Sequence, residues 1–407
     1  MKKWIALVFG ALCALSLAFA QGTDPAAVLK EIQELRATRS REAREAKKAL
    51  DFNAVNAEVK AKAEAALKGV DLMMVADKDA LSWAKLCAEA GRYQDGCMLA
   101  EKFIKTNPEP KVKYDAQIFM LSCCTELGEG AMIEQTLAAV TPVNGGDAVN
   151  LAMLTANMYV DEIKADKGAA AALKAIERIE KLVPYAELTT EQDKARGDSA
   201  RSSLAIAKAE LLVEMKRKDD AMKALDEAIG AMDPKSPLLR RVKSTMTQYA
   251  IVDSAAPAMP AERTIGEYAG LDAYKGKVVI LDFFAHWCGP CIRSFPDLKN
   301  LYEANKDKGL VVVGVTSYYG FYKQENAQKR DMEKDTEFAK MGEFIKDHSM
   351  TWPVIYTDKA NYDLYGVSGI PHVVLIDKKG AVHKIKVGYS PDSFAEFRKV
   401  VEALLKE

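Results

Sequence analysis

Two cysteines, Cys288 and Cys291, stand three positions apart directly after the largely apolar run Val278–Phe284. This order predicts a buried strand, followed by a turn that presents both thiols at the start of a helix. The helix dipole and free backbone N–H groups at such a start stabilise a thiolate, so the pattern favours reversible thiol–disulfide exchange. The alternatives are a structural bridge or half of a zinc site. A four-thiolate zinc site needs a second ligand pair, and none follows Cys291, so we expect no metal.

Several short motifs surround this pair in a fixed order and spacing. From about Pro260 to Glu407 the chain resembles the thioredoxin fold, and within that fold it is similar to the exported TlpA/ResA-type thiol–disulfide oxidoreductases. The resemblance covers about a third of the chain. The matching motifs are Tyr274–Val279, Trp287–Cys291, Phe295-Pro296, Val311–Val315 and Gly369–Asp377.

The resemblance implies a role for each residue around the cysteine pair. Cys288 would be the attacking thiol and Cys291 the resolving thiol of a redox-active disulfide, with no further cofactor. Pro371 would be a cis-proline that faces this disulfide, and an Ile-Pro bond in a tight turn suits a cis peptide on general grounds as well. The backbone of Ile370 would pair with an extended substrate, so we assign Trp287, Ile370 and Pro371 to substrate binding.

Asp282 lies six residues before Cys288, where thioredoxin-like sequences carry a buried acid. The resolving thiol Cys291 must lose its proton during exchange, and burial raises the pKa of a carboxyl group into the range that suits this transfer. We therefore expect Asp282 to be a catalytic residue. The alternative is an acid of the core paired with Lys275 or Lys277.

Further polar and aromatic side chains flank the dithiol. His286 and His372 could bind a metal, but two histidines beside a redox pair more often tune the stability of a thiolate. The run Tyr318–Tyr322 follows a strand whose end opens on the dithiol side of the sheet. It could form an aromatic rim for substrate or pack against an inserted helix expected at Phe338–His348.

The leading hypothesis is an exported reductase of protein disulfides that takes electrons from an upstream thiol protein. Gly289 and Pro290 between the cysteines form the pair that the resemblance associates with a reducing potential. An oxidase or isomerase with the same residues is the alternative, because the potential depends on thiolate stabilisation. ResA-like sequences often carry an acid at the position of Ser294, and its absence weakens any transfer of their substrate preference. A third possibility is an interaction scaffold with a vestigial redox module, against which the intact site argues.

The first twenty residues are typical of a secretory signal peptide. Lys2 and Lys3 precede an apolar core from Ile5 to Leu17, and Ala18–Ala20 forms a small-x-small cleavage site. Cys13 would leave with the peptide. We therefore expect a protein exported to the periplasm or another extracytoplasmic space, tethered to the membrane only if the signal stays uncleaved.

Length and charge limit the remaining possibilities. A chain of 407 residues is expected to form two or three domains. The net charge is −1, and removal of Lys2 and Lys3 leaves 55 basic against 58 acidic residues, or −3. This balance offers no basic footprint for nucleic acid.

Four cysteines remain outside the CxxC motif after removal of the signal: Cys87, Cys97, Cys123 and Cys124. Cys87 and Cys97 are equidistant from a predicted turn, and so are Cys97 and Cys123, which suits antiparallel helix neighbours. In an oxidising compartment we expect at least one disulfide that links Cys87 or Cys97 to Cys123 or Cys124. The alternative is that they are free buried thiols.

The predicted fold class is a multi-domain chain, in which an all-α domain of helical-hairpin repeats precedes an α/β thioredoxin-like domain. Residues 21–78 form an N-terminal helical segment. Residues 79–250 resemble tetratricopeptide repeats, since turns at Asn107-Pro108 and Thr141-Pro142 are 34 residues apart; plain helical hairpins are the alternative. Residues 251–262, rich in Ala and Pro, predict an extended linker, and 263–407 predict a mainly parallel sheet covered on both faces.

Overall fold

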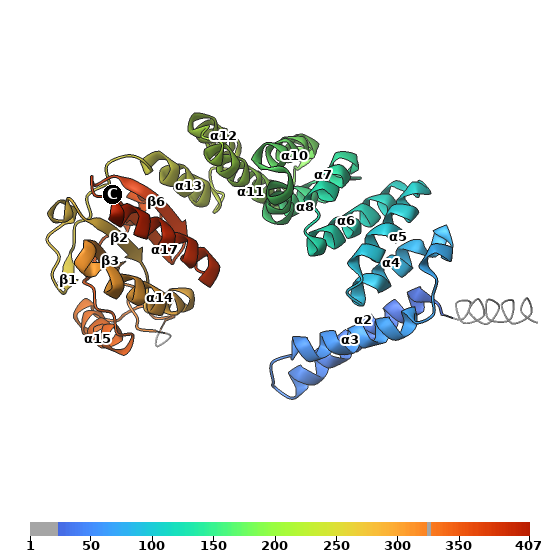
Figure 1. Ribbon diagram of the computed structural model, residues 1–407, viewed down its shortest axis with the longest axis horizontal. Coiled ribbons are helices and arrows are strands. Elements are labelled where there is room, and N and C mark those ends of the chain that lie inside the picture. Colours follow the sequence, from blue (N-terminus) through green and yellow to red (C-terminus); the bar gives the residue numbers. More distant parts are fainter. Residues whose placement is uncertain (1–22, 324–326) are drawn as a thin grey trace, which may run out of the picture. The chain divides into compact units, whose positions relative to one another are not determined.

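A computed structural model describes residues 23–323 and 327–407, which fall into two compact units that divide between Arg217 and Lys218 (Figure 1). The expected signal peptide at residues 1–20, Cys13 included, lies outside the described residues. Among the residues that are described, no helix combines the length and the apolar character needed to cross a bilayer.

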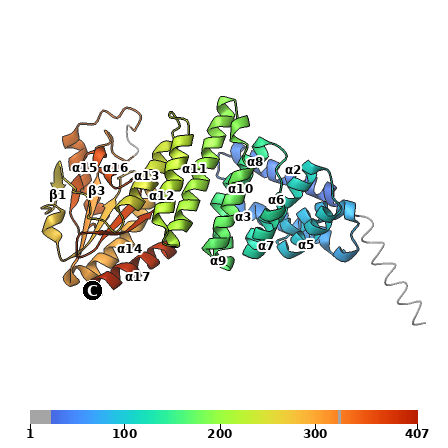
Figure 2. The same cartoon turned by 90° about the horizontal axis from the view of Figure 1, so that it is seen from above.

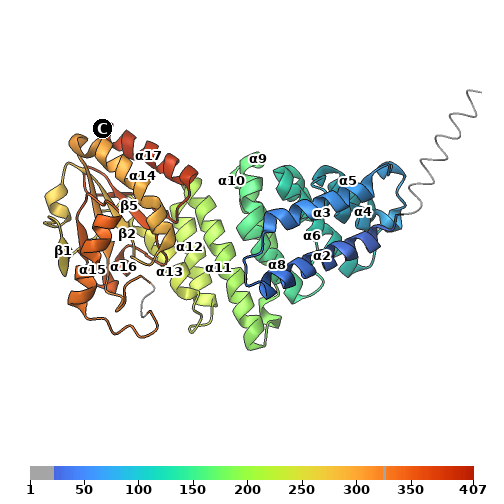
Figure 3. The same cartoon turned by 90° about the horizontal axis from the view of Figure 1, so that it is seen from below.

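The first unit is built from helices that pack against their neighbours in sequence, as the all-α half of the predicted fold class requires. The N-terminal helices α2 and α3 lie side by side and both contact α4 (Figure 3). Its helices are α2 (Pro25–Glu45), α3 (Phe52–Leu67), α4 (Ala80–Glu89), α5 (Tyr93–Lys105), α6 (Pro110–Leu127), α7 (Gly130–Ala139), α8 (Gly145–Leu154), α9 (Val160–Lys167), α10 (Ala169–Leu182) and α11 (Glu191–Glu214).

The four cysteines of this unit lie buried in the core of the helices α4, α5 and α6. All four are free thiols, so the expected disulfide is absent from this structure. The sulfurs of Cys97 and Cys124 make a hydrogen-bond contact of 3.5 Å, well beyond the length of about 2.05 Å that a disulfide requires. The structure thus shows the buried free thiols that the sequence left open as the alternative.

The second unit begins earlier than the sequence predicts, with the helices α12 (Lys218–Ala231) and α13 (Leu239–Ile251). Both were expected to belong to the repeat region. They group with the C-terminal domain because α12 and α13 pack together and α13 packs on helix α16 (Lys359–Leu364). Lys218 also donates from Nζ to the carbonyl oxygen of Val252, at 2.9 Å. The structure therefore groups this pair with the sheet, whereas the sequence placed both helices in a repeat region that ends at residue 250.

The expected spacer at 251–262 is extended, but it is not an unpacked linker. It lies along the sheet, where Asp253 N donates to Val382 O at 2.8 Å and Ala256 N donates to Gly380 O at 2.9 Å. The Met259 side chain is buried in one of the two cores of the domain. Small residues and prolines favour extended backbone, and here the sheet edge and an apolar core hold that backbone in place.

The sheet of the second unit has six strands in the order β1-β4-β3-β2-β5-β6. Strands β2, β3 and β4 are mutually parallel neighbours, whereas β1, β5 and β6 pair antiparallel. The sheet is therefore mixed rather than mainly parallel, because β5 runs antiparallel to the central strand β2 and β1 runs antiparallel to β4. A tight turn around Gly380 joins β5 to β6 as a hairpin. The strands are β1 (Arg263–Ile265), β2 (Val278–Phe283), β3 (Leu310–Thr316), β4 (Val354–Tyr356), β5 (His372–Ile376) and β6 (Val382–Val387).

Helices cover both faces of this sheet, as the predicted thioredoxin-like class requires (Figure 2). Helices α14 (Gly289–Asn305), α15 (Lys334–Asp347) and α17 (Pro391–Lys406) build one core, and α16 contributes to the other. In the central strand, Val278 and Ile280 belong to the first core, while Val279 and Leu281 belong to the second. Since side chains alternate along a strand, Asp282 is directed toward the face that α14 covers.

Candidate active site

Cys288 and Cys291 form a disulfide at the N-terminus of α14, with their Cα atoms 5.3 Å apart. Cys288 is the N-cap residue, and its sulfur accepts a hydrogen bond from the backbone N–H of Cys291 at 3.2 Å. Gly289 and Pro290 occupy the first helical positions, where the missing N–H of proline costs no hydrogen bond. This geometry stabilises negative charge on the sulfur of Cys288 once the disulfide is reduced.

Cys288 is almost fully enclosed in this structure. Its accessible fraction is 4%, against 0% for Cys291. Cys288 is more enclosed than a surface thiol because it belongs to the apolar core on the α14 face, against which Ile370 packs. Cys288 is nevertheless more accessible to solvent than Cys291.

The three residues expected to bind substrate occupy different settings. The Ile370-Pro371 peptide bond is cis, as predicted, and directly precedes β5. The Pro371 carbonyl oxygen accepts from the N–H of Gly388 at 2.8 Å. Trp287, by contrast, exposes 38% of its surface to solvent.

Asp282 is an acid enclosed in the central strand β2, with 1% of its surface accessible. Neither carboxylate oxygen has a hydrogen-bond partner among the residues that the structure describes. Burial raises the pKa of Asp282 from 3.8 to about 7. The alternative of an ion pair with Lys275 is wrong, because Lys275 Nζ lies 2.9 Å from Asp272 instead.

The strand neighbours of Asp282 provide no hydrogen-bond partner for its carboxylate. In the β-sheet register, Gly314 of β3 and Val373 of β5 flank Asp282 on either side. A Cβ atom at Gly314 would approach Phe284 Cε1 to 3.0 Å, so the core tolerates only glycine there without a shift. Asp282 is thus held among apolar groups, which is the condition that keeps a carboxyl group protonated near neutral pH.

The two histidines are both buried, but they lie in different surroundings. His372 begins β5 and meets the ring of Phe283 edge-on, with centroids 5.5 Å apart. Burial lowers the pKa of His372 to about 4, so its imidazole is neutral at physiological pH. Within residues 23–323 and 327–407, no group of three or more His, Cys, Asp or Glu side chains is arranged to hold a metal ion.

The ring of His286 lies among the aromatic rings of the run Tyr318–Tyr322, which follows β3. Its ring is 5.5 Å from that of Tyr319 and 5.4 Å from that of Phe321, edge-on in both cases. Phe321 and Tyr322 are buried, and Tyr322 shares a core with α15. Tyr322 therefore packs with the inserted helix, whereas Tyr319 reaches the edge of Trp287, with ring centroids 5.4 Å apart.

Sequence reasoning missed Glu337, a fully enclosed carboxylate on α15 whose oxygens accept from the backbone N–H groups of Tyr319 and Gly320, both at 2.9 Å. A signal was available. Glu337 precedes Met341 by four positions and Phe344 by seven, so it continues the apolar stripe of the expected inserted helix one residue before the expected start at Phe338. An acid on such a stripe must be paired or hydrogen-bonded.

Comparison with known proteins agrees with this geometry. The Redoxin family model matches residues 251–404. The thiol-disulfide oxidoreductase ResA of Bacillus subtilis is 31% identical over 141 residues, a match that covers 34% of this chain and 69% of ResA. The chain belongs to the ResA-type thiol–disulfide oxidoreductases.

A further relative and a solved structure are each similar to about a third of this oxidoreductase. The thioredoxin-like protein YneN of Bacillus subtilis is 30% identical over 133 residues, covering 33% of this chain and 69% of YneN. Among solved structures, StoA from Bacillus subtilis is 23% identical with a TM-score of 0.28, and the match covers 35% of this chain and 97% of StoA. The Redoxin match begins at residue 251, so it includes the segment 251–262 that packs on the sheet.

Proposed function

We propose that this oxidoreductase is exported and reduces disulfides of other proteins through Cys288 and Cys291. The observation that carries the proposal is the pair of sulfurs at the N-terminus of α14, close in sequence to the exposed Trp287 and enclosed by the core that Ile370 contacts. Export rests on the signal-like residues 1–20. A thiol protein of the same compartment would supply the electrons.

In the first step, the Cys288 thiolate attacks one sulfur of a substrate disulfide. A mixed disulfide forms between Cys288 and the substrate, and the other substrate sulfur leaves as a thiolate. The N–H of Cys291 and the helix dipole stabilise the Cys288 thiolate before attack. The exposed Trp287 and the backbone of Ile370 would hold the substrate segment during this step.

In the second step, Cys291 attacks the sulfur of Cys288 and releases the second substrate thiol. Two electrons have then passed from the dithiol to the substrate, and the Cys288–Cys291 disulfide is formed. Cys291 is fully buried and must lose its proton within the protein. Asp282 is the proposed acceptor, because its pKa of about 7 lets the carboxylate form near neutral pH.

The direct test is the reduction of a disulfide-bonded model protein, such as insulin, by a small dithiol in the presence of the full chain. Wild-type protein should accelerate the reaction. Cys288→Ser should abolish the acceleration, because the remaining described cysteines are buried thiols. A Cys288→Ser variant that keeps most of the activity would show that another thiol is the nucleophile.

A second candidate is a thiol oxidase or isomerase that uses the same residues. The hydrogen bond from Cys291 N to the Cys288 sulfur favours the oxidase, because stabilisation of the Cys288 thiolate makes the disulfide more oxidising. The potential of the Cys288–Cys291 couple, measured against glutathione, separates the two. A value close to −270 mV supports the reductase, and a value near −120 mV supports the oxidase.

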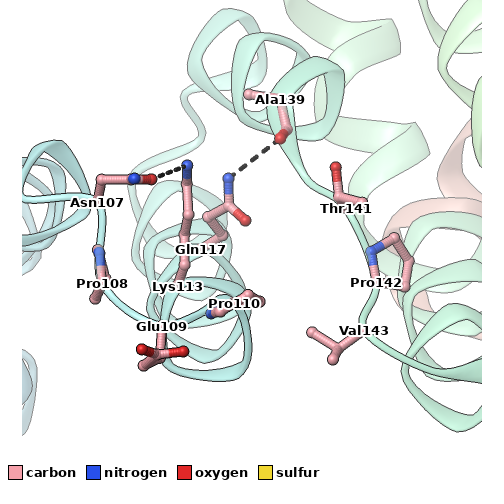
Figure 4. Close-up of a pocket in the computed structure, with 10 residues that line it drawn as sticks. All are labelled: Asn107, Pro108, Glu109, Pro110, Lys113, Gln117, Ala139, Thr141, Pro142 and Val143. Carbon is pink, nitrogen blue, oxygen red and sulfur yellow. Dashed lines mark hydrogen bonds between the residues drawn. The ribbon is translucent and has the colours of Figure 1, made fainter.

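For the first unit we propose a partner-binding role built on tetratricopeptide-like hairpins. The helical content is consistent with such repeats. A cavity of about 440 Å³ lies between the loop that joins α5 to α6 and the loop that follows α7 (Figure 4). Its wall includes Glu109 and Lys113, together with Gln117, whose Nε2 donates to Ala139 O at 3.3 Å. A pull-down with the Lys113→Glu variant as control would test whether this surface binds a protein partner.

A further inference from the structure

The carboxylate of Glu337 ties the inserted helix α15 to the turn that follows β3. Only 1% of the residue is accessible. Oε1 accepts the N–H of Tyr319 and Oε2 accepts the N–H of Gly320, each at 2.9 Å. A buried carboxylate is costly unless such donors satisfy it, so this side chain and this turn stabilise each other.

His286 makes a second connection to the same turn. Its Nδ1 accepts the backbone N–H of Lys323 at 2.9 Å, which places the proton of the neutral ring on Nε2. Nε2 lies 3.7 Å from Oε1 of Glu337. The imidazole is thus held at the far end of the turn through Nδ1, while Nε2 lies beside the acid that holds the near end without a hydrogen bond to it.

The turn is fixed from a third side by the chain that enters α15. Met332 N donates to Gly320 O at 2.9 Å, and Gly320 has a φ of +76°. A Cβ atom at Gly320 would meet the backbone of Arg330. The position therefore requires glycine both for its conformation and for its space.

The residues that these contacts hold lead directly, along the chain, to the dithiol. His286 is followed directly by Trp287 and Cys288 in the chain. Tyr319, which Glu337 holds by its N–H, places its ring edge-on to Trp287 with centroids 5.4 Å apart. Trp287 and Tyr319 thus form an aromatic wall that stands one residue before Cys288 in the chain, and Glu337 holds the backbone of this wall from α15.

We propose that Glu337 is a positioning residue for exchange with protein disulfides. It fixes the turn 319–323 so that Trp287 and Tyr319 present a rigid wall to an extended, disulfide-bonded polypeptide. The inference rests on the proposed function and names the surface that selects its substrate. A small disulfide needs only access to Cys288, whereas a polypeptide must also lie against this wall, so loss of Glu337 acts on the two substrates unequally.

The test compares Glu337→Gln with Glu343→Gln, which lies exposed on the same helix. In Glu337→Gln, an amide donor replaces one acceptor oxygen and faces a backbone N–H. We expect kcat/KM for insulin reduction to fall about tenfold, because a small misplacement of a docking surface disturbs the reacting geometry. Reduction of glutathione disulfide should change less than about twofold, and Glu343→Gln should match the wild type on both substrates.

A substitution of Tyr319 tests the same wall without removing the buried acid. Tyr319→Phe keeps the ring edge beside Trp287 and should retain insulin reduction, whereas Tyr319→Ala should reproduce the selective loss. Equal losses on both substrates in Glu337→Gln, or equal rates for the two Tyr319 variants, would overturn the proposal. So would an unchanged insulin rate in Glu337→Gln.

Acrylamide quenching provides a readout that is independent of any protein substrate. Trp83 and Trp352 are buried, so in a chain that lacks residues 1–20 the quenching reports chiefly on Trp287. Quenching should increase in Glu337→Gln and stay unchanged in Glu343→Gln. A wild-type enzyme that fails to reduce insulin would count against the proposed function, while the quenching result would still decide the role of Glu337.

Discussion

Gln248 Nε2 donates a hydrogen bond of 2.6 Å to the carbonyl oxygen of Gly366, 118 residues further along the chain. The bond joins α13 to the end of α16, which covers the sheet face opposite the dithiol helix. Helix α13 is therefore an integral part of the redox domain rather than a terminal repeat of the helical unit. A fragment that begins near residue 260 would lose this helix together with Met259.

The first prediction concerns that contact. Gly366 has a φ of +63°, and a Cβ atom there would clash with the Ser244 carbonyl oxygen of α13. Gly380 has a φ of +84° but nothing within 4 Å of its Cβ position. Both alanine variants bear the strain of a positive φ, so the difference between their free energies of unfolding isolates the cost of the clash. Gly366→Ala should lower the free energy of unfolding by about 2 kcal/mol more than Gly380→Ala, as overpacking does.

Urea unfolding of the full chain, followed by tryptophan fluorescence, measures this difference. Trp352 is buried in the redox domain and reports its unfolding. Equal destabilisation by the two variants would show that α13 does not press on Gly366 in solution. It would then support a domain boundary nearer to residue 250.

The second prediction concerns the pH dependence of stability that Asp282 causes. Its folded pKa of about 7 lies above its ordinary value of 3.8, so between these values the folded protein binds more protons than the unfolded chain. Stability therefore falls as the pH rises from about 4 to about 7 and is constant above that range. A shift of this size corresponds to a loss on the order of 4 kcal/mol, which Asp282→Asn should remove.

Unfolding of the oxidised protein at pH 5 and pH 8 tests whether stability falls as the pH rises. Between pH 5 and pH 8 the stability of the wild type should fall by on the order of 3 kcal/mol relative to that of Asp282→Asn. The same variant should slow the release of substrate by on the order of 10²-fold or more while leaving the initial attack little changed. A stability difference between variant and wild type that is the same at both pH values, with both steps slowed alike, would assign Asp282 a structural role.

The parts of the site that could be predicted from sequence are those encoded by short contiguous patterns. The strand that carries Asp282 and the helix start at Cys288 and Cys291 follow from adjacent residue types, and the cis peptide before Pro371 is what the family resemblance implies. The covered sheet and the helical hairpins follow from apolar periodicity.

The parts that could not be predicted depend on contacts between distant segments. Nothing near Glu337 in sequence reveals that its acceptors would meet the N–H groups of Tyr319 and Gly320, 17 or 18 residues earlier. The docking of α13 on α16 and the pairing of residues 251–262 with the sheet are of the same kind. The enclosed setting of Cys288 also depends on a core that assembles only in the folded domain.

The third prediction concerns the order of the two cysteines. Cys291→Ser lacks the resolving thiol, so its reaction with a protein disulfide should stop at a mixed disulfide on Cys288. Non-reducing electrophoresis should show a covalent adduct that a dithiol reverses. Cys288→Ser should form no such adduct, since Cys291 is fully buried behind it. Adduct formation by Cys288→Ser, and not by Cys291→Ser, would reverse the assigned roles.

The last prediction concerns the four cysteines of the helical unit. All are buried, and burial raises the pKa of Cys87 to about 11, so this thiol is protonated and shielded from reagents. In the Cys288→Ser, Cys291→Ser double variant without residues 1–20, iodoacetamide should label no cysteine of the native protein and four of the denatured, unreduced protein. Four labels after denaturation would agree with free thiols in the structure. Two labels would reveal the disulfide that the sequence predicts for an oxidising compartment, and tryptic mapping would show whether Cys87 or Cys97 takes part, because cleavage after Arg92 separates them.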